Sequence, residues 1–242
     1  MESSVYRLMA STQQTHWWFE GRRAVLRAII GQLDLPAGAR ILEIGCGTGG
    51  NLPMLAQFGT VFGVEMDDYA LARAREVSNC DIEEGWLPDR LPFDGQLFDL
   101  VCLLDVLEHI EDDAAALRAV AGRLKPGGFA LVTVPAYQWL YGAHDRLHHH
   151  IRRYSADRLA RKALDAGLQV RRSGYFNALL FPLIAAVRLR KRILRLDETQ
   201  EAAMPGRIVN RWLYRVFAFE AAIVPHVLFP FGISCLAVLE RR

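Results

Sequence analysis

The sequence has few cysteines, the residues that stabilise small secreted or zinc-binding domains. Among its 242 residues are four cysteines, at positions 46, 80, 102 and 235, and no two of them have the spacing of a zinc site or a redox pair. This scatter predicts reduced thiols in the cytoplasm. The first ten residues are polar, so we expect no signal peptide there.

Long uninterrupted apolar runs are also missing. Residues 173–187 carry no charge, but this window is shorter than the roughly 20 apolar residues that cross a bilayer. Residues 221–239 are interrupted by Pro225, Pro230 and Gly232, and their end is expected to form a strand. Neither window therefore predicts a membrane span.

The formal net charge of +2 conceals two regions of opposite sign. Residues 1–150 contain 12 Lys and Arg against 20 Asp and Glu, whereas residues 151–215 contain 15 against 5. We expect the second region to meet an anionic partner. We do not expect nucleic acid as that partner, because the basic residues are mixed with long apolar runs and not with the stacking side chains of a groove binder.

Short apolar runs alternate with helical patterns along the chain. Runs typical of buried strands lie at residues 41–44, 60–65, 80–84, 98–104 and 129–134. Helical patterns lie between them at residues 52–58, 69–77 and 114–124. This alternation predicts a doubly wound parallel sheet.

The most informative stretch, residues 41–52, leads from the first strand into a glycine-rich turn. Gly45, Gly47 and Gly49 allow a tight turn and let a ligand approach the backbone, and the next helix directs its free N–H groups to the same place. Glu65 lies 20 residues after Gly45, where an acid at the end of the second strand accepts hydrogen bonds from a ribose diol. The stretch predicts a small-molecule site.

Two kinds of cofactor fit this turn. Residues 45–50 satisfy the G-x-G-x-x-G pattern, so an NAD(P)-dependent oxidoreductase is the alternative hypothesis. Glu43 argues against it, because a carboxylate two residues before the first glycine repels a pyrophosphate but reaches a cationic amino-acid head group.

Six blocks in order, over residues 38–135, resemble the class I S-adenosylmethionine-dependent methyltransferases, in particular the type 11-like family. They lie at residues 41–49, 64–67, 91–93, 98–101, 107–109 and 124–128. The resemblance implies S-adenosyl-L-methionine as cofactor. It also implies a Rossmann-like sheet of seven strands in the order 3-2-1-4-5-7-6, with the sixth strand near residues 168–175 and an antiparallel last strand near residues 233–239.

The resemblance implies roles in cofactor binding as well. The residues assigned to the cofactor are Glu43, Gly45, Cys46, Gly47, Asn51, Glu65, Met66, Trp86, Leu87 and Leu104. The glycine turn approaches the methionine moiety, Glu65 takes the ribose hydroxyls, and Leu104 lies below the sulfonium. Met66 packs on adenine, with Trp86 at its edge in place of the acid or serine that many relatives carry there.

The acceptor is expected beyond the fifth strand, where four histidines lie between positions 144 and 150. We predict His149 or His144 as general base, with Asp145 orienting an imidazole. Arg152 and Arg153 are predicted to bind an acceptor phosphate or carboxylate. A structural ion pair between Asp145 and one of these arginines is the alternative. The acceptor assignments are catalytic His149, His144 and Asp145, and substrate-binding Arg152, Arg153 and Tyr154.

No metal is expected. Asp105, Glu108 and His109 have a spacing that shares one helical face and resembles a block of the ubiquinone-type O-methyltransferases, but we favour Asp105 as a helix cap. The tract His148–His150 is also a poor metal site, because consecutive side chains diverge.

We predict a single domain over residues 1–242. It is divided into an N-terminal helical segment (1–37), a cofactor-binding core (38–176), a helical insert (177–230) and a final strand (231–242). Trp17 or Trp18 is a candidate lid over the ligand, with packing on the sheet as the alternative. In the insert, an apolar run precedes a basic run. This pattern fits peripheral membrane contact through residues 177–195, a lid over a long apolar acceptor, or a homodimer surface.

The sequence thus predicts a cytoplasmic methyltransferase, peripheral to the inner membrane surface if residues 177–195 bind it. Its acceptor is a small molecule or a lipid- or glycan-linked molecule, methylated by direct displacement. Residues 135–154 resemble a bacterial methyltransferase group linked to glycan or lipid-sugar metabolism. A non-catalytic membrane-surface module is a further alternative.

Overall fold

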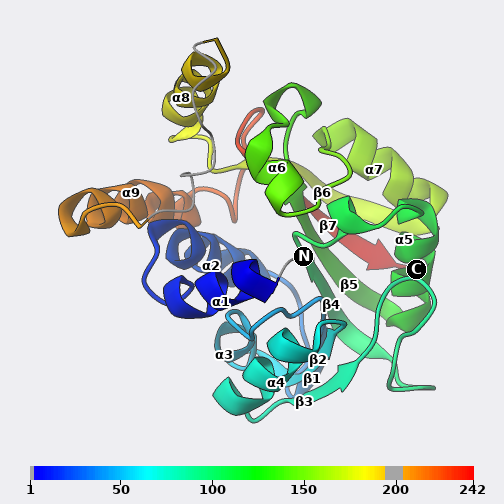
Figure 1. Cartoon of the computed structure of the whole chain (residues 1–242). Helices are drawn as coiled ribbons and strands as arrows, with labels where there is room; N and C mark the ends of the chain where they lie inside the picture. Colours follow the sequence, from blue (N-terminus) through cyan, green and yellow to red (C-terminus); the bar gives the residue numbers. More distant parts are fainter. Residues whose placement is uncertain (1–2, 194–203) are drawn as a thin grey trace.

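The computed structural model of this protein describes residues 3–193 and 204–242, and the described strands join into one sheet (Figure 1). The strands are β1 (Ala39–Ile44), β2 (Gly59–Glu65), β3 (Asp81–Glu84), β4 (Phe98–Leu104), β5 (Leu124–Pro135), β6 (Leu168–Phe176) and β7 (Ser234–Arg241). Their order is β3-β2-β1-β4-β5-β7-β6, and β7 runs antiparallel to both of its neighbours. This confirms the predicted order and the reversed last strand.

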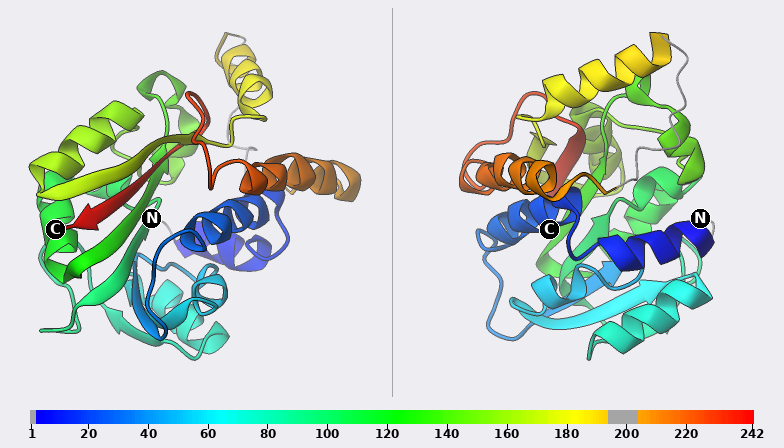
Figure 2. Two further views of the ribbon diagram at one scale, coloured as in Figure 1. Left: turned by 180° about the vertical axis from the view of Figure 1, so that it is seen from behind. Right: turned by 60° about the vertical axis from the view of Figure 1, so that its left-hand side comes forward.

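Helices cover both faces of the sheet (Figure 2). The α-helices are α1 (Ser3–Thr12), α2 (Trp17–Ile30), α3 (Leu52–Leu55), α4 (Asp68–Val77), α5 (Asp113–Arg123), α6 (Ala143–Leu147), α7 (Ala156–Asp165), α8 (Phe181–Ile193) and α9 (Arg207–Phe219). Short 3-10 turns are η1 (Leu107–His109), η2 (Gln138–Leu140) and η4 (Glu220–Ala222).

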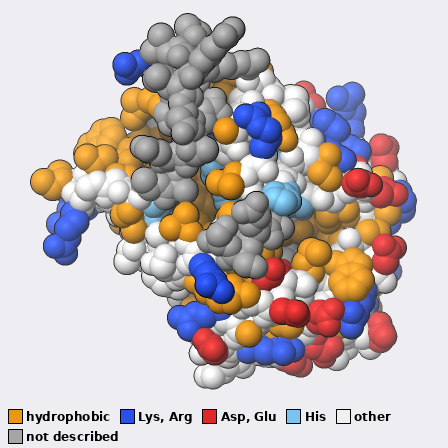
Figure 3. All heavy atoms as spheres, viewed as in Figure 1, with side chains coloured by type: hydrophobic (Ala, Val, Ile, Leu, Met, Phe, Trp, Pro, Cys, Tyr) orange, Lys and Arg blue, Asp and Glu red, His pale blue; other side chains and the backbone are white. Residues whose placement is uncertain are grey.

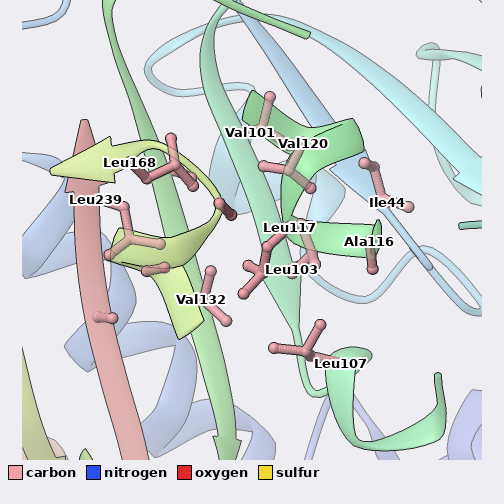
Figure 4. Close-up of a cluster of buried hydrophobic side chains, with 14 of the residues drawn as sticks. Ile44, Val101, Leu103, Leu107, Ala116, Leu117, Val120, Val132, Leu168 and Leu239 are labelled. Carbon is pink, nitrogen blue, oxygen red and sulfur yellow. The ribbon is translucent and has the colours of Figure 1, made fainter. Parts of the chain in front are cut away.

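Two apolar cores lie on opposite faces of the sheet, as the alternation of side chains along β4 shows. Val101 and Leu103 pack with α5 and α7, in the cluster drawn in Figure 4. Leu100 and Cys102 pack on the other side with α2, α3, α4 and α9. Because both faces are covered, all seven residues of β4 are buried. Each fully buried leucine contributes about 1.5–3 kcal/mol.

The side chain that caps α4 belongs to Asp67, which accepts a hydrogen bond from Ala70 N at 3.0 Å. One strand boundary differs from the sequence predictions. β5 begins at Leu124, five residues before the predicted start. Leu124 follows α5 directly and pairs with Phe98 of β4, so pairing with the neighbouring strand extends β5 backwards past the Pro-Gly-Gly turn signal.

The insert between β6 and β7 forms α8 and α9, which extend beyond the sheet on one side of the molecule (Figures 1 and 2). α9 packs on α2 where Gly21 lies against Phe217; a Cβ on Gly21 would come within 2.4 Å of the phenyl ring. Among the described residues, no helix has the length and apolar character to cross a membrane. Positions 194 and 195 of the predicted membrane-contact segment lie outside the described residues.

Candidate functional site

A cavity of about 1270 Å³ lies at the carboxyl ends of the central strands. Its wall includes residues at the ends of β1, β2 and β4, together with side chains from α1, α2, α6 and α8. Ligand sites of drug-sized molecules occupy roughly 300–1,000 Å³. The cavity therefore has room for a cofactor and a second molecule beside it.

The glycine turn forms one end of this cavity. Gly45 has φ +71°, and a Cβ there would lie 2.6 Å from Val106, so only glycine fits. Gly47 also has a positive φ of +55°, but a Cβ built on it meets no protein atom within 4 Å. The turn thus presents bare backbone to open space, as a ligand cradle requires.

Glu65 holds the turn in place from the end of β2. Its buried carboxylate accepts hydrogen bonds from the backbone N–H groups of Gly47 (2.7 Å), Met66 (2.9 Å) and Asp67 (3.0 Å). Burial raises the pKa of Glu65, and these three N–H groups partly offset the rise. Glu65 also lines the cavity, and its contact with the ribose hydroxyls stays a prediction.

Helix α1 covers the same end of the cavity, which the sequence reasoning missed. The Tyr6 hydroxyl donates to Glu65 Oε1 at 3.4 Å. Gln13 is buried and accepts a hydrogen bond from Thr48 Oγ1 at 3.0 Å. Gly50 was the available signal: a Cβ there would lie 2.3 Å from Gln13 Oε1, so glycine is needed for the Gln13 side chain, which follows α1 and packs on it.

Glu43 lies behind the cavity wall. It is 1 % exposed and does not line the cavity, whereas Asn51 does. The Asn51 amide donates to Glu43 Oε1 at 2.8 Å, so the carboxylate orients a residue that faces the ligand. Burial raises the pKa of Glu43 to about 7, against the opposing effects of the Asn51 hydrogen bond and the Arg22 charge. We had predicted that Glu43 contacts the cofactor directly. Its position indicates an indirect role instead, in which Glu43 orients Asn51.

The other predicted cofactor residues line the cavity together. Cys46, Leu87 and Leu104 are buried in its wall, and Met66 and Trp86 are partly exposed at its rim. The Arg90 guanidinium lies 4.9 Å from the centre of the Trp86 ring. The individual contacts with adenine and methionine remain predictions.

Trp17, Trp18 and Arg22 line the cavity from α2. Trp17 packs edge-on against Phe217 of α9, with ring centres 6.1 Å apart, so it combines a packing role with a place in the wall. Arg22 forms an ion pair with Asp105 at 3.1 Å. Asp105 follows β4 at φ +61° and also accepts from Thr133. We had expected Asp105 to cap a helix, but the side chain that caps the next α-helix, α5, belongs to Asp112.

Histidines form the opposite end of the cavity. Figure 3 shows histidine side chains beside hydrophobic ones on the face viewed in Figure 1. The cavity wall includes His109, His144, His148, His149 and His150. Burial lowers the pKa of His144 to about 3 and that of His148 to about 4, aided by neighbouring positive charge. Both imidazoles are therefore neutral near pH 7.

Asp145 orients an imidazole, but a different one from those predicted. Its buried carboxylate lies 2.9 Å from His150 Nδ1, whereas we had expected it beside His144 or His149. It also forms a two-point ion pair with Arg153, at 2.8 and 2.9 Å. Burial alone would raise the pKa of Asp145, but these partners hold it well below its usual range. The structure thus shows the ion pair that was the alternative prediction for Arg153.

Arg152 and Tyr154 lie outside the cavity wall, which corrects their predicted role. The Tyr154 hydroxyl is buried and donates to Asp113 Oδ2 at 2.8 Å. Arg152 forms an ion pair with the same carboxylate at 2.9 Å, and Lys162 approaches its other oxygen at 2.6 Å. This cluster joins α5 to α7. Arg153 lines the cavity, but its charge is paired with Asp145, so no residue of this set is placed to bind an acceptor anion.

Comparison with known proteins identifies the fold and the family. Residues 18–173 match the family model described as a methyltransferase domain. The chain belongs to the methyltransferase domain family. The match confirms the resemblance inferred from the six sequence blocks, and with it S-adenosylmethionine as the cofactor of this fold.

Named relatives of this methyltransferase domain cover only part of it. The ubiquinone biosynthesis O-methyltransferase of Neisseria meningitidis serogroup C is 33% identical over 108 residues, which are 41% of this chain and 45% of the relative. Cycloartenol-C-24-methyltransferase 1 of Oryza sativa subsp. japonica is 28% identical over 122 residues, which are 47% and 34% of the two chains. The chain thus spans less than half the length of these relatives.

Solved structures share the fold over most of the methyltransferase chain. The S-adenosylmethionine-dependent methyltransferase of Mesorhizobium loti aligns with TM-score 0.59 and 18% identity, covering 90% of this chain and 98% of the other. Magnesium protoporphyrin IX methyltransferase of Synechocystis PCC 6803, solved with bound S-adenosylhomocysteine, aligns with TM-score 0.55 and 13% identity, covering 92% and 83%. At these identities the likeness concerns the fold alone.

Proposed function

We propose that the protein transfers the methyl group of S-adenosylmethionine to an acceptor that enters the histidine end of the cavity. The observation that carries this proposal is that one cavity has two chemically different ends. One end is a bare glycine turn supported by Glu65, and the other is lined by histidines and apolar side chains. Such a cavity can hold a cofactor and an acceptor in contact.

When bound, the cofactor supplies an electrophilic methyl group on a sulfonium. The acceptor atom would bond to this methyl carbon as the carbon–sulfur bond breaks, so the role of the protein would be mainly to align the two molecules. A hydroxyl acceptor also needs a base. His144 and His148, with pKa values of about 3 and 4, hold a proton poorly near pH 7. His149, at the exposed rim of the cavity, remains our predicted base.

The acceptor that best suits the cavity is apolar and lipid-linked. Leu183, Ile184 and Val187 of α8 line the cavity beside the histidines. Leu183 and Val187 are also exposed to solvent, so the apolar wall continues from the cavity to the outer surface of α8. This continuity supports an acceptor whose apolar portion extends out of the site.

We propose that α8 and α9 contact an anionic membrane that carries this acceptor. Neither helix contains an Asp or Glu. On α9, Arg207, Arg211 and Arg215 recur at four-residue spacing, and Ile208 and Trp212 beside them are 87% and 54% exposed. Basic side chains beside an exposed apolar stripe are typical of interfacial helices.

Vesicle co-sedimentation tests the membrane contact. We expect binding to vesicles rich in phosphatidylglycerol and little binding to pure phosphatidylcholine. Changing Arg207, Arg211 and Arg215 to Gln should abolish it. The matched control changes the exposed Arg73, Arg118 and Arg161, on α4, α5 and α7, to Gln and should bind like the parent. Equal binding by both variants, or self-association through α9 in place of vesicle binding, would contradict the proposal.

Methyl-labelled S-adenosylmethionine tests the reaction. Incubation with a membrane lipid extract should transfer label to the organic phase, and His149→Ala should lower the rate while S-adenosylhomocysteine affinity stays near the parent value. Label found only in water-soluble acceptors would refute the lipid-linked class. An unchanged rate in the variant would remove His149 as the base.

A further inference from the structure

Three side chains from two separate segments converge at the histidine end of the cavity. Glu108 and His109 belong to η1, which begins shortly after β4, and His150 follows α6. One donor atom from each lies within 4.8 Å of the other two. All three residues line the cavity. The cluster therefore combines a carboxylate and two imidazoles beside the space assigned to the acceptor.

Glu108 is the unusual member of this cluster. Its side chain is 0% exposed, and neither carboxylate oxygen has a hydrogen-bond partner among the described residues. A buried carboxylate without partners is strongly unfavourable, because it has lost its hydration and gained nothing in return. A cation bound between Glu108 and the imidazoles removes this cost.

Both imidazoles are oriented by contacts behind them. Asp145 lies 2.9 Å from His150 Nδ1, which leaves His150 Nε2 facing Glu108 Oε1 at 3.9 Å. Asp145 is itself held by Arg153 and by the Gly142 N–H at 2.8 Å. The His109 ring has a hydrogen bond to the backbone of His149 and lies nearly perpendicular to His150, with ring centres 4.8 Å apart.

A carboxylate behind a histidine is the usual support of a metal-binding imidazole. The contact selects the tautomer in which the outer nitrogen is free to bind, and it strengthens that nitrogen as a ligand. The pair Asp145–His150 has this arrangement, and Arg153 balances the charge of the same carboxylate.

We propose that Glu108, His109 and His150 bind a divalent transition-metal ion of the Zn²⁺ type. Two imidazoles and one carboxylate suit zinc and its neighbours, whereas Mg²⁺ prefers oxygen ligands alone. Two ligand atoms of a tetrahedral zinc ion lie roughly 3.2–3.5 Å apart. The three donor atoms lie within 4.8 Å of one another, so binding would draw the side chains together by up to about 1.5 Å. Because all three residues line the cavity, a further position on the ion would be reached from the cavity.

This site takes Glu108 and His109 from the block for which the sequence predicted no metal, and His150 from the adjacent-histidine tract. Only His150 of that tract takes part, so the divergence of consecutive side chains is no obstacle. The role of the ion rests on the proposed function: an acceptor hydroxyl bound at its open position would lose its proton more easily. Metal binding itself does not depend on that function.

Metal titration of the full-length chain tests the proposal. After treatment with a chelator, the parent should bind one equivalent of Zn²⁺ by calorimetry, and Co²⁺ should give the visible absorption bands of a low-symmetry site. Glu108→Gln and His150→Ala should each weaken Zn²⁺ binding at least 100-fold. Asp145→Asn removes the carboxylate that supports His150 and pairs with Arg153, and it should weaken Zn²⁺ binding about 10- to 100-fold.

His226→Ala is the matched control, because it removes an exposed imidazole outside the cavity wall. It should bind Zn²⁺ like the parent. Binding of S-adenosylhomocysteine by each variant reports whether the fold is intact. Failure of the parent to bind Zn²⁺, or equal binding by Glu108→Gln and His226→Ala, would overturn the site. One bound equivalent that depends on Glu108, without methyl transfer in any assay, would uphold the site and refute the proposed function.

Discussion

At the scale of residues, the buried acids differ in how many hydrogen-bond partners their carboxylates have. Glu65 accepts three backbone N–H groups, and Glu220 accepts two, from Asn177 at 2.6 Å and Leu179 at 2.9 Å. Glu43 has one partner, Asn51. Glu108 has no hydrogen-bond partner among the described residues. The first two acids stabilise turns, whereas the last leads to the proposed metal site.

Replacing Glu65 tests the cofactor end of the cavity. Glu65→Gln keeps the shape but removes the charge that accepts from the Gly47 N–H and faces the predicted ribose position. A charge-assisted hydrogen bond contributes about 1.5–3 kcal/mol, so affinity for S-adenosylhomocysteine should fall roughly 10- to 100-fold. Calorimetry measures this affinity, and the control is Glu84→Gln, which changes an exposed acid. Equal affinity in both variants would exclude a binding role for Glu65.

The depressed histidines predict how stability depends on pH. His144 and His148 have folded pKa values of about 3 and 4, below the ordinary 6.5. Their contribution to the free energy of unfolding is therefore fully present above pH 6.5 and is lost as the pH falls towards 4. Glu43 has a raised pKa of about 7, so it has the opposite effect on stability: its protonation below pH 7 favours the folded state.

Urea midpoints between pH 8 and pH 4.5 measure this effect. His148→Gln should flatten the loss of stability below pH 6.5, since its side chain no longer takes up a proton on unfolding. His226→Gln removes an exposed imidazole and should leave the profile unchanged. Parallel profiles for parent and His148→Gln would show that His148 does not contribute.

At the scale of elements, two glycines let helices approach closely. Gly21 of α2 accommodates Phe217 of α9, and Gly50 accommodates Gln13, which follows α1. These contacts place the N-terminal helices against the insert on one side and over the cofactor turn on the other. They connect three segments that are far apart in the sequence into one cavity wall.

Gly50→Ala tests the closure of α1 over the turn. Its Cβ would lie 2.3 Å from Gln13 Oε1, so Gln13 must move, and overpacking of this kind costs about 1–3 kcal/mol. We expect lower thermal stability and weaker S-adenosylhomocysteine binding, both largely restored in the double variant with Gln13→Ala. On α5, Gly122→Ala meets no atom within 4 Å and should be neutral or stabilising. A double variant as weak as Gly50→Ala would point to the turn itself.

At the scale of the whole molecule, the sheet brings the ends of β1, β2 and β4 to one edge, and helices from both ends of the chain enclose the space above it. A doubly wound sheet binds its ligands at such an edge. Ligand binding should therefore stabilise the entire domain.

Saturating S-adenosylhomocysteine should raise the melting temperature. A ligand at 100 times its Kd adds about 2.7 kcal/mol, which corresponds to roughly 5–10 °C in a domain of this size. Differential scanning calorimetry measures the shift. NAD at the same concentration should give none. An equal shift with NAD would revive the oxidoreductase hypothesis.

Much of the fold was predictable because its signals are local. The apolar period of each strand, the Ser155 cap of α7 and the glycines of the cofactor turn are all encoded within a few residues. Boundaries were less predictable, as at β5, where pairing with β4 extends the strand to Leu124. Strand pairing depends on a partner from another part of the sequence.

The sequence by itself determined the order of elements, the family and the glycine turn that is predicted to receive the cofactor. The tertiary structure alone decided which polar groups meet. Asp145 pairs with His150 and not with its neighbour His144, and Glu108 lies beside His150 although 42 positions separate them. The physical reason is that periodicity shows which face of an element is buried. The side chain that it meets there depends on how distant elements pack.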